Sequence, residues 1–365
     1  MEKEKKDKML KMVSETIEKM ENKDFFVYFY VIDTKGNPSS QVEYIYETAL
    51  TLKKLGYNVA ILHQENDFVG VGDWLGEEYA NIEHHNIEKE NVEISACDFL
   101  FIPEIFANVM MQTKKLPCKR VILIQNYKHI CEFLPVSQSM ETLSITDAIV
   151  TTEEQDEKIS KYFPTLNTHI VHPSIKKMFR KNTEPQEFII NVICKEQSIV
   201  HQIVKPFYWE NPIYKWVSFR DLRGTTQELF ANALREAAIT VWVDDDTVFG
   251  YSLLEALRSG SLVIAKIPNN PPAWMLDNDG NLIDSVLWVS DIDEMPDVLA
   301  KTVRSWTLDR IPQTIYDNQD KTNDLFSEEQ QCEEIKKVYI NDLFGKRLSD
   351  FKEVKKDIEN NVFEN

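Results

Sequence analysis

Short apolar runs alternate with longer amphipathic stretches along most of this chain. Runs rich in β-branched and aromatic residues are typical of buried strands, whereas apolar residues at helical spacing predict helices. In the first half the predicted strands are Phe25–Ile32, Asn58–Leu62, Phe99–Ile102, Arg120–Gln125, Asp147–Thr152 and Thr168–His172. In the second half they are Phe188–Cys194, Tyr214–Ser218, Ile239–Val243, Leu262–Ala265 and Ser285–Val289. Strands that alternate with helices in this way predict an α/β protein with parallel sheets.

Interruptions of this pattern divide the chain into parts. A polar stretch from Pro173 to Glu187 separates the two series of strands, so we predict domains over residues 24–175 and 185–305. Residues 1–23 mix Lys and Glu around one apolar stripe. This stripe predicts an accessory helix that packs on the protein or associates with a second copy. Residues 306–365 have no strand pattern and are predicted to be helical.

The segment Ile239–Ala265 predicts a strand, a loop, a helix and a second strand. The helix is indicated by leucines at helical spacing and by Gly260, which is a suitable C-terminal cap. Its first amides would point out of the carboxyl edge of the sheet, where an anion is favoured. These amides belong to Gly250, Tyr251 and Ser252.

Two local patterns in this segment each allow a second interpretation. Ser252-x-x-Glu255 has the spacing of a capping box, in which Ser252 would be the N-cap and Glu255 would satisfy its amide. The run Asp244–Asp246 after the strand is a candidate for binding a divalent cation, although acids at a strand end also simply face solvent. We rank the metal site below a metal-independent anion site.

The loop and helix resemble a known signature. Phe249-Gly250, Leu253-Leu254-Glu255-Ala256 and the following Gly260 resemble the motif of retaining family 4 glycosyltransferases of the GT-B fold. That motif has a Glu-x7-Glu spacing around a Gly-Phe-Gly loop. The resemblance implies two Rossmann-like domains facing across a cleft, with the C-terminal one binding a nucleotide-sugar and the N-terminal one on the acceptor side. The family's first Glu falls at Thr247 in this chain, with Asp246 one residue away.

The same resemblance implies roles for further residues. Glu255 would accept hydrogen bonds from the ribose, and the loop from Phe249 to Ser252, including Gly250 and Tyr251, would hold the diphosphate and sugar. Gly36 would lie under the donor phosphates, Lys195 would stand at a cationic position of the family, and Asn126 would face a sugar. The candidate catalytic residues are then Thr247, Glu255 and Asn126. The resemblance also implies that residues 306–365 cross back onto the first domain. Local alternatives are a plain turn at Gly36, a loop turn at Asn126 and an exposed lysine at Lys195.

The amino-acid composition limits the classes of partner that the protein is expected to bind. The 365 residues include 41 Lys and Arg against 60 Asp and Glu, a net charge of −19 that disfavours nucleic acid and anionic lipid. Five cysteines without a Cys-x-x-Cys pair predict free thiols in a reducing cytoplasm and no zinc site. We expect no membrane-spanning segment and no secretion signal, because the chain has no long apolar run and its first residues are charged.

The resemblance and the composition together imply a cytoplasmic, metal-independent glycosyltransferase that needs no cofactor besides its nucleoside-diphosphate sugar. The acceptor is an unidentified hydroxyl of a glycan, protein, lipid or small molecule, and the expected outcome is retention at the anomeric carbon. Two alternatives stay open. Thr247 and the absence of the family's Arg and Lys pair favour a catalytically decayed binding or scaffold protein. A transferase acting on DNA bases is the other, and the negative charge argues against it.

Overall fold

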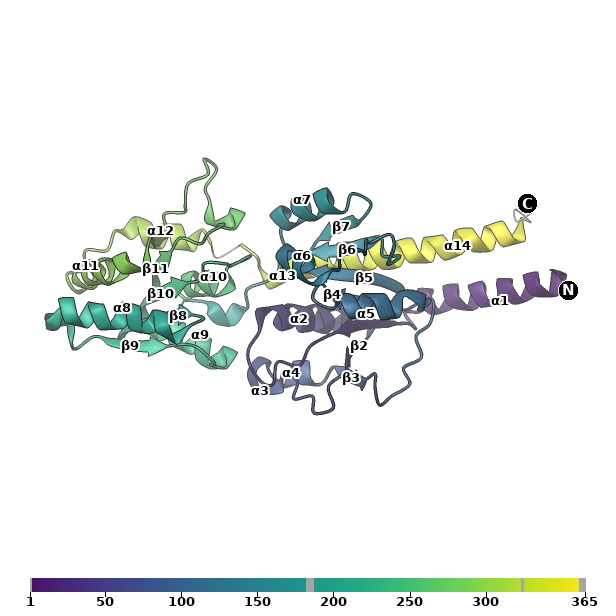
Figure 1. The fold of residues 1–365 in the computed structure, drawn as a ribbon, viewed down its shortest axis with the longest axis horizontal. Coiled ribbons are helices and arrows are strands. Elements are labelled where there is room, and N and C mark those ends of the chain that lie inside the picture. The colour runs from purple at the N-terminus through teal and green to yellow at the C-terminus, as the bar shows by residue number, and fades with distance from the viewer. Residues whose placement is uncertain (1, 182–186, 323–324, 361–365) are drawn as a thin grey trace. The chain divides into compact units, whose positions relative to one another are not determined.

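The computed structural model describes residues 2–181, 187–322 and 325–360, and it divides into two compact units. The first unit contains residues 1–173 and 329–365, and the second contains residues 174–328. Each unit is built on a parallel β-sheet with helices between its strands (Figure 1). The α/β architecture predicted from the alternation of strands and helices is confirmed.

The sheet of the first unit has seven strands in the order β3-β2-β1-β4-β5-β6-β7. Their bounds are β1 Phe26–Tyr30, β2 Asn58–His63, β3 Glu83–Asn86, β4 Phe99–Pro103, β5 Lys119–Ile124, β6 Asp147–Val150 and β7 Asn167–Ile170. The helices of this unit are α1 Glu2–Glu21, α2 Ser40–Lys54, α3 Gly72–Leu75, α4 Glu77–Ala80, α5 Ala107–Gln112, α6 Tyr127–Phe133, α7 Glu153–Tyr162, α13 Glu328–Ile335 and α14 Lys346–Glu359. A π-helical stretch, Lys336–Gly345, joins α13 to α14.

Both faces of this sheet are buried, which explains the continuous apolar run in β1. Val27 and Phe29 pack into one hydrophobic cluster with residues of α2 and the C-terminal helices. Tyr28 and Tyr30 point to the opposite face and pack with residues of α5, α6 and α7. Because successive side chains of a strand alternate between faces, a strand covered on both sides has no polar positions.

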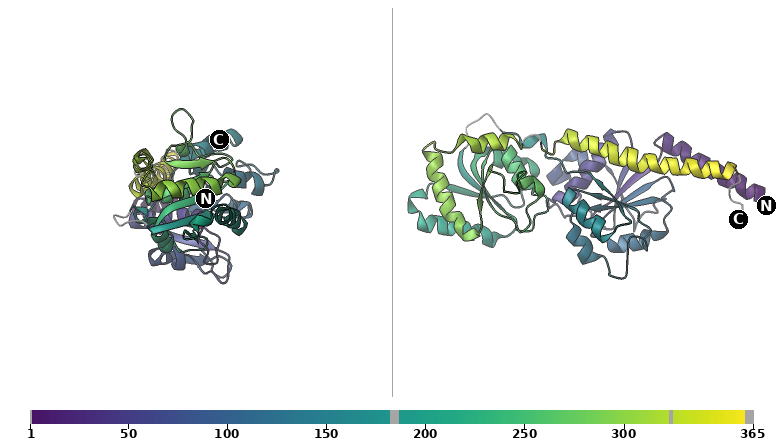
Figure 2. Two further views of the ribbon diagram at one scale, coloured as in Figure 1. Left: turned by 90° about the vertical axis from the view of Figure 1, so that its left-hand side faces the viewer. Right: turned by 90° about the horizontal axis from the view of Figure 1, so that it is seen from above.

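Residues 2–21 form α1, which packs against α14. Figure 2 shows the two helices side by side, α1 in purple and α14 in yellow. Ile17 and Met20 of α1 are buried, and Lys352 Nζ lies 2.6 Å from Glu21 Oε1. Met9 and Met12 are exposed. The apolar stripe is therefore covered within the chain at one end of α1, and self-association remains a prediction.

The second unit has five strands in the order β12-β11-β10-β8-β9. Their bounds are β8 Glu187–Cys194, β9 Ser218–Asp221, β10 Ala237–Val243, β11 Leu262–Lys266 and β12 Val286–Val289. The helices of the unit are α8 Gln197–Glu210, α9 Gln227–Glu236, α10 Tyr251–Arg258, α11 Met295–Thr307 and α12 Gln313–Asp320. β10 lies at the centre and is buried along its whole length. The carboxyl ends of β8, β10 and β11 therefore meet at one edge of the sheet.

Two strand predictions were wrong or incomplete. The strand predicted at Tyr214–Ser218 is a 3-10 helix, Pro212–Tyr214, followed by a turn, and β9 begins only at Ser218. Pro212 favours the start of this turn, and the ring of Tyr214 stacks on Phe207 instead of joining the sheet. β3 was missed because its Glu-His-His-Asn sequence has no β-branched residue; it pairs only with β2 at the sheet edge.

Candidate functional site

The loop between β10 and α10 ends in a backbone conformation that favours glycine. Gly250 is the N-cap of α10 with φ 81° and ψ 41°, in the left-handed region. A Cβ at this position would lie 2.4 Å from Met275 Cε and 3.3 Å from Trp274 Cζ2. Glycine is favoured here by its left-handed conformation, and a Cβ would require the terminal methyl of Met275 to move. The first-turn amides of α10 therefore leave the helix beside an N-cap that has no side chain, where an anion is favoured.

The capping box proposed for Ser252 and Glu255 is wrong. α10 begins at Tyr251, so Ser252 lies inside the helix, and its Oγ accepts a hydrogen bond from Trp242 Nε1 at 3.0 Å. The N-cap is Gly250, which has no side chain that could take part in a box. Glu255 lies one turn further on and is 9% exposed. Glu255 therefore does not take part in a capping box, and its contact with a ribose remains a prediction.

Phe249 and Thr247 complete the loop. Phe249 is buried, with its ring 4.7 Å from Tyr251 and 4.9 Å from Phe326, and its carbonyl accepts a hydrogen bond from Trp274 Nε1 at 2.6 Å. Thr247 Oγ1 lies 3.9 Å from the position that a Cβ on Gly250 would occupy. The structure thus places Thr247 next to the N-terminus of α10, with Phe249 anchoring the loop between them.

Two lysines lie at the same edge of the sheet. Lys195 follows β8 and its Nζ lies 2.7 Å from Asp244 Oδ1. Lys266 ends β11, and its Nζ lies 2.6 Å from Asp245 Oδ1. The sequence analysis missed Lys266, although a lysine directly after a predicted strand is a usable signal, because strand ends carry ligand groups in such sheets.

These ion pairs also bear on the metal alternative. Asp244 and Asp245 each have a lysine ammonium as counter-ion. In the part of the chain that the structure describes, no three His, Cys, Asp or Glu side chains are grouped so that they could hold a metal ion. The choice between a metal site and a metal-independent anion site at this edge therefore remains a prediction.

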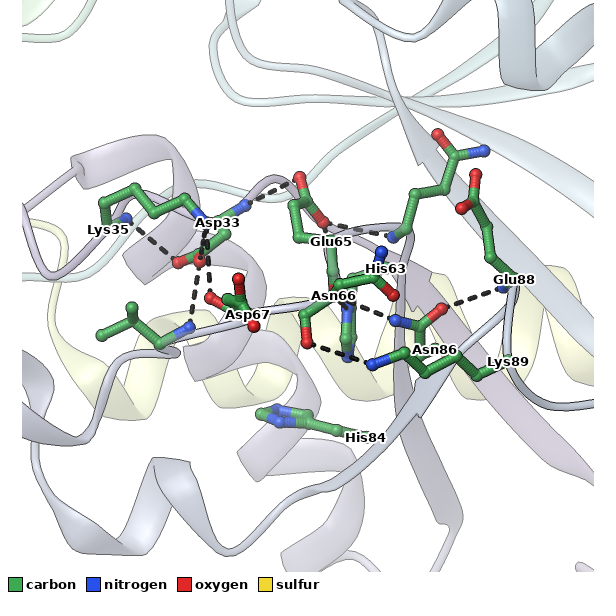
Figure 3. Close-up of polar contacts among 12 residues, drawn as sticks. Asp33, Lys35, His63, Glu65, Asn66, Asp67, His84, Asn86, Glu88 and Lys89 are labelled. Carbon is green, nitrogen blue, oxygen red and sulfur yellow. Dashed lines mark hydrogen bonds and ion pairs between the residues drawn. The ribbon is translucent and has the colours of Figure 1, made fainter.

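Gly36 lies in the first unit, in a turn held by a buried carboxylate. Gly36 has φ 77°, in the left-handed region. Asp33 accepts hydrogen bonds from the amides of Val69 at 2.9 Å and Lys35 at 3.0 Å, and Lys35 Nζ lies 2.9 Å away (Figure 3). Burial alone would raise the pKa of Asp33, but the hydrogen bonds from Val69 and Lys35 outweigh it and hold the pKa below its usual value.

The loops that follow β1, β2 and β3 are tied into one polar network. Glu65 Oε1 accepts a hydrogen bond from the Asp33 amide at 3.4 Å, and the Glu65 carbonyl accepts one from Asn86 Nδ2 at 2.9 Å (Figure 3). His84, on β3, contacts the hydroxyl of Tyr46 at 3.1 Å, and burial lowers its pKa to about 4. His84 is therefore neutral at physiological pH, and hydrogen bonds through Glu65 connect the turn that contains Asp33 to the end of β3.

Asn126 has a structural role at the end of β5. It is the N-cap of α6, and its Oδ1 accepts a hydrogen bond from the Lys128 amide at 3.1 Å. Its own amide donates to Glu104 Oε1 at 2.9 Å, and His129 Nδ1 lies 3.2 Å from the same oxygen. The hydrogen bond to Glu104 raises the pKa of His129. The local turn that was the alternative role for Asn126 is observed, whereas the contact of Asn126 with a sugar remains a prediction.

The sequence analysis also missed Glu104 and His129. Glu104 directly follows β4 and is 2% exposed, so it belongs to the carboxyl edge of the first sheet. The structure brings Glu104, Asn126 and His129 together there. It brings Lys195, Gly250, Tyr251 and Ser252 to the corresponding edge of the second sheet, with Thr247 beside them.

No protein-family model matches this chain. An alpha-1,6-glucosyltransferase from Actinobacillus pleuropneumoniae serotype 7 is 26% identical over 253 residues, which cover 67% of this chain and 74% of that protein. Among solved structures, the chain is similar to sucrose-phosphate synthase from Thermosynechococcus elongatus, with 11% identity, TM-score 0.59 and coverage of 87% and 98%. It is also similar to Anabaena HepE in complex with UDP-glucose, with 10% identity, TM-score 0.59 and coverage of 87% and 99%.

A glycosyltransferase from Rickettsia africae gives a TM-score of 0.57 at 11% identity, with coverage of 89% and 98%. At these identities the similarity to solved structures concerns the fold, and the fold is GT-B, as the loop signature had implied. Together with the glucosyltransferase relative, it supports a glycosyltransferase. Within the residues described, no helix combines the length and the apolar character needed to cross a bilayer.

Proposed function

We propose that this protein is a glycosyltransferase that moves a hexosyl group from a nucleoside-diphosphate sugar to a hydroxyl acceptor with retention at the anomeric carbon. The observation that carries the proposal is the edge of the second sheet. Gly250 opens the N-terminus of α10, and Lys195 and Lys266 stand at the ends of the neighbouring strands. Amides, a helix N-terminus and lysines together provide the positive field that a diphosphate leaving group requires.

Each part of this edge has a role in the proposed reaction. The first-turn amides of α10 bind the diphosphate and stabilise the charge that develops as the glycosidic bond breaks. Lys195 and Lys266 exchange their aspartate partners for phosphate oxygens, so the reaction needs no bound metal. Glu255 accepts hydrogen bonds from the ribose, and the site acts mainly by positioning the donor.

The remaining assignments follow from the same proposal. Thr247 stands beside the donor sugar in place of a carboxylate, and Gly36 and Asn126 keep the roles that the family resemblance implies. Glucose is the first sugar to test, because the curated relative is a glucosyltransferase. A cytoplasmic location is part of the same proposal, because five cysteines without a Cys-x-x-Cys pair are typical of a reducing compartment.

The proposal is tested by calorimetric titration of UDP-glucose, ADP-glucose and the two free diphosphates into the full-length protein, with EDTA present. We expect one pair to bind without metal. Glu255→Ala should weaken that binding by about 1.5 to 3 kcal/mol, roughly 10- to 100-fold, because a hydrogen-bonded charged group is removed. Glu210→Ala, which removes an exposed glutamate at the end of α8, is the matched control and should bind like wild type.

Four outcomes would contradict parts of this proposal. If none of the four ligands binds, the proposed donor site is wrong. If binding requires a metal ion, the alternative of a metal site at Asp244–Asp246 is favoured. Equal affinity of Glu255→Ala and wild type would remove the ribose contact. If the donor binds but is neither hydrolysed nor transferred, and Thr247→Glu restores turnover, the protein is the decayed binding protein that the sequence left open.

A further inference from the structure

The second unit exposes large apolar side chains at the amino edge of its sheet, where the parallel strands β8 and β9 begin. This edge is opposite to the carboxyl edge, which leads to Gly250. Trp209 lies in the last turn of α8, and Ile213 and Trp216 lie in the connection from α8 to β9. These three side chains are 73%, 77% and 52% exposed, in that order. They contribute little to the core of the unit, so a role outside the core accounts for them better.

The exposed side chains belong to one continuous surface. The ring centroid of Phe188, at the start of β8, lies 4.8 Å from that of Trp216 and 4.7 Å from that of Trp306, in the last turn of α11. Trp216 is also 6.4 Å from Tyr214, and Leu308 directly after α11 is exposed. Helices α8 and α11 lie side by side (Figure 1). We define the aromatic patch as Phe188, Trp209, Ile213, Tyr214, Trp216, Trp306 and Leu308. Contiguous apolar surface of this kind marks interaction sites.

The patch rests on aromatic side chains that point inward. Phe207 is buried, and its ring centroid lies 5.9 Å from that of Tyr214 and 5.2 Å from that of Phe219. The Tyr208 hydroxyl donates a hydrogen bond to the Val217 carbonyl. These contacts fix the segment between α8 and β9. The outward side chains are therefore held in place before a partner arrives, which lowers the ordering cost of association.

The charged residues next to the patch indicate which partner it fits. Six exposed residues within two positions of a patch member are charged, the acids Glu187, Glu210 and Asp309 and the bases Lys215, Arg304 and Arg310. Among the residues that the structure describes, none of the six forms an ion pair with another. The patch thus has three charges of each sign in a chain whose net charge is −19.

Equal numbers of both signs favour a second copy of this chain over a lipid surface. In a two-fold symmetric contact the same surface occurs on both sides, so its charges must be compensated by their own copies. Three acids and three bases permit this, because each base of one copy can face an acid of the other. Lipid-binding surfaces, in contrast, combine apolar residues with an excess of Lys and Arg.

We propose that the aromatic patch is the interface of a two-fold symmetric dimer of this chain. Trp209 and Trp216 are its anchors, since Trp, Tyr and Arg carry most of the binding energy in protein interfaces. The interface lies at the edge of the sheet opposite to Gly250. This inference does not depend on the proposed function, and it concerns a different surface from the apolar stripe of α1.

The test measures the mass of the full-length protein by sedimentation velocity and by light scattering over a wide range of protein concentrations. The mass should rise from 42.6 kDa towards twice this value as the concentration increases. Trp209→Ala should raise the dissociation constant of the dimer at least about tenfold while leaving the melting temperature of the monomer unchanged. Leu229→Ala is the matched control, because Leu229 is 59% exposed but lies at the start of α9, outside the patch.

A second variant keeps the test decisive if Trp209→Ala does not fold. Ile213→Asp places a like charge on both copies at an exposed turn and should abolish the dimer. The inference is overturned if the protein stays at 42.6 kDa at every concentration, or if both variants dimerise as wild type does. It is also overturned if Met9→Asp in α1 abolishes the dimer, because the interface then lies on α1. Monomers that cosediment with phosphatidylcholine and phosphatidylglycerol vesicles, and lose this binding in Trp209→Ala, would assign the patch to a lipid surface instead.

Discussion

The two units share an architecture but differ in how their sheet edges carry charge. In the first unit the acids at the carboxyl edge, Asp33 and Glu104, are buried and hold backbone amides. In the second unit the charges are lysine and aspartate pairs nearer the surface, with Lys195 Nζ 2.7 Å from Asp244. The buried acids of the first edge are bound mainly by backbone amides, with Lys35 also paired to Asp33, whereas the more exposed acids of the second edge are paired with Lys195 and Lys266. The common fold supplies the edge, and local chemistry determines what each edge can bind.

Under the proposed function, a nucleoside-diphosphate donor brings negative charge and needs amides and cations, which the second unit has at Gly250, Lys195 and Lys266. A substitution in one unit should therefore leave the stability and the ligand binding of the other unit unchanged.

The largest expected effect tests the glycine turns of the two edges. Gly250→Ala combines a left-handed backbone with a contact of 2.4 Å to Met275, and should cost about 2 to 5 kcal/mol of stability. Gly36→Ala has the same backbone strain, but its nearest neighbour would be Val69 Cγ1 at 3.9 Å, so we expect only about 1 to 2 kcal/mol. Hydrogen exchange measured on peptides from each unit would show which unit loses stability.

Equal losses in the two variants would contradict the crowding at Gly250. The comparison between the units would also fail if Gly250→Ala opened the first unit as much as the second. Gly280→Ala is a further control, because Gly280 has φ 81° like Gly250 but open space where a Cβ would lie. It isolates the cost of the backbone conformation from that of the contact.

Much of the fold was predictable because the central strands are buried on both faces. β1 and β10 are continuous apolar runs, and such runs are visible in any sequence. β3 has no such signal, because an edge strand that is half exposed tolerates Glu and His. The strand predicted at Tyr214–Ser218 failed for the opposite reason, since aromatic residues there pack around Phe207 outside the sheet.

The candidate site was predictable only where its residues are neighbours in the sequence. The loop from Thr247 to Ser252 and the following helix could be identified together. The pairing of Lys266 with Asp245 depends on β11 lying next to β10 in the sheet, which no local pattern encodes. Ser252 satisfied the capping-box spacing, but Gly250 took the N-cap position because of its left-handed backbone. Glu104 and His129 are distant in sequence, and only the order of β4 and β5 brings them together.

An intermediate effect should appear in the pH dependence of the first unit. Burial lowers the pKa of His172, but hydrogen bonds to Glu334 and Glu153 outweigh it and raise the pKa above the usual value. The stabilisation is therefore complete below the unfolded pKa of about 6.5 and is lost as the pH rises through the folded pKa. Glu334→Gln should cost about 1.5 kcal/mol at pH 6, the low end for a charged hydrogen bond because Glu334 is partly exposed, and less at pH 8.

His84 has the opposite sign in the same unit. Its folded pKa of about 4 lies below the unfolded value, so it destabilises the unit as the pH falls from about 6.5 towards 4. The first unit should thus be most stable near pH 6.5, while the second, whose only histidine is the exposed His201, should vary less in this range. Hydrogen exchange between pH 5 and 8 measures both, with Glu353→Gln on α14 as a neutral control. Equal pH profiles in the two units would contradict the assignment.

Substitution of the lysines that pair with aspartates in the second unit should have the smallest effect on stability. These variants are the most direct test of the difference between the two sheet edges. Lys195 is 71% exposed, so Lys195→Gln should change the free energy of unfolding by less than about 1 kcal/mol. Its affinity for UDP should nevertheless fall several-fold, more at low salt than at high salt, because a cation that faces phosphate is lost. Affinity for uridine, which has no phosphate, should not change. Lys266→Gln should lower the affinity for UDP in the same way.

The corresponding variant in the first unit is Lys35→Gln, because Lys35 also pairs with an aspartate at a sheet edge. Lys35 is tied to Asp33 by its backbone amide as well as its side chain, and this arrangement serves the turn at Gly36. We therefore expect Lys35→Gln to bind UDP like wild type, and calorimetric titration at two salt concentrations measures this. A loss of UDP affinity equal to that of Lys195→Gln would erase the distinction between the two edges. It would show instead that Lys35 contributes a cation to the diphosphate, which would agree with the expectation that the loop of Gly36 lies under the donor phosphates.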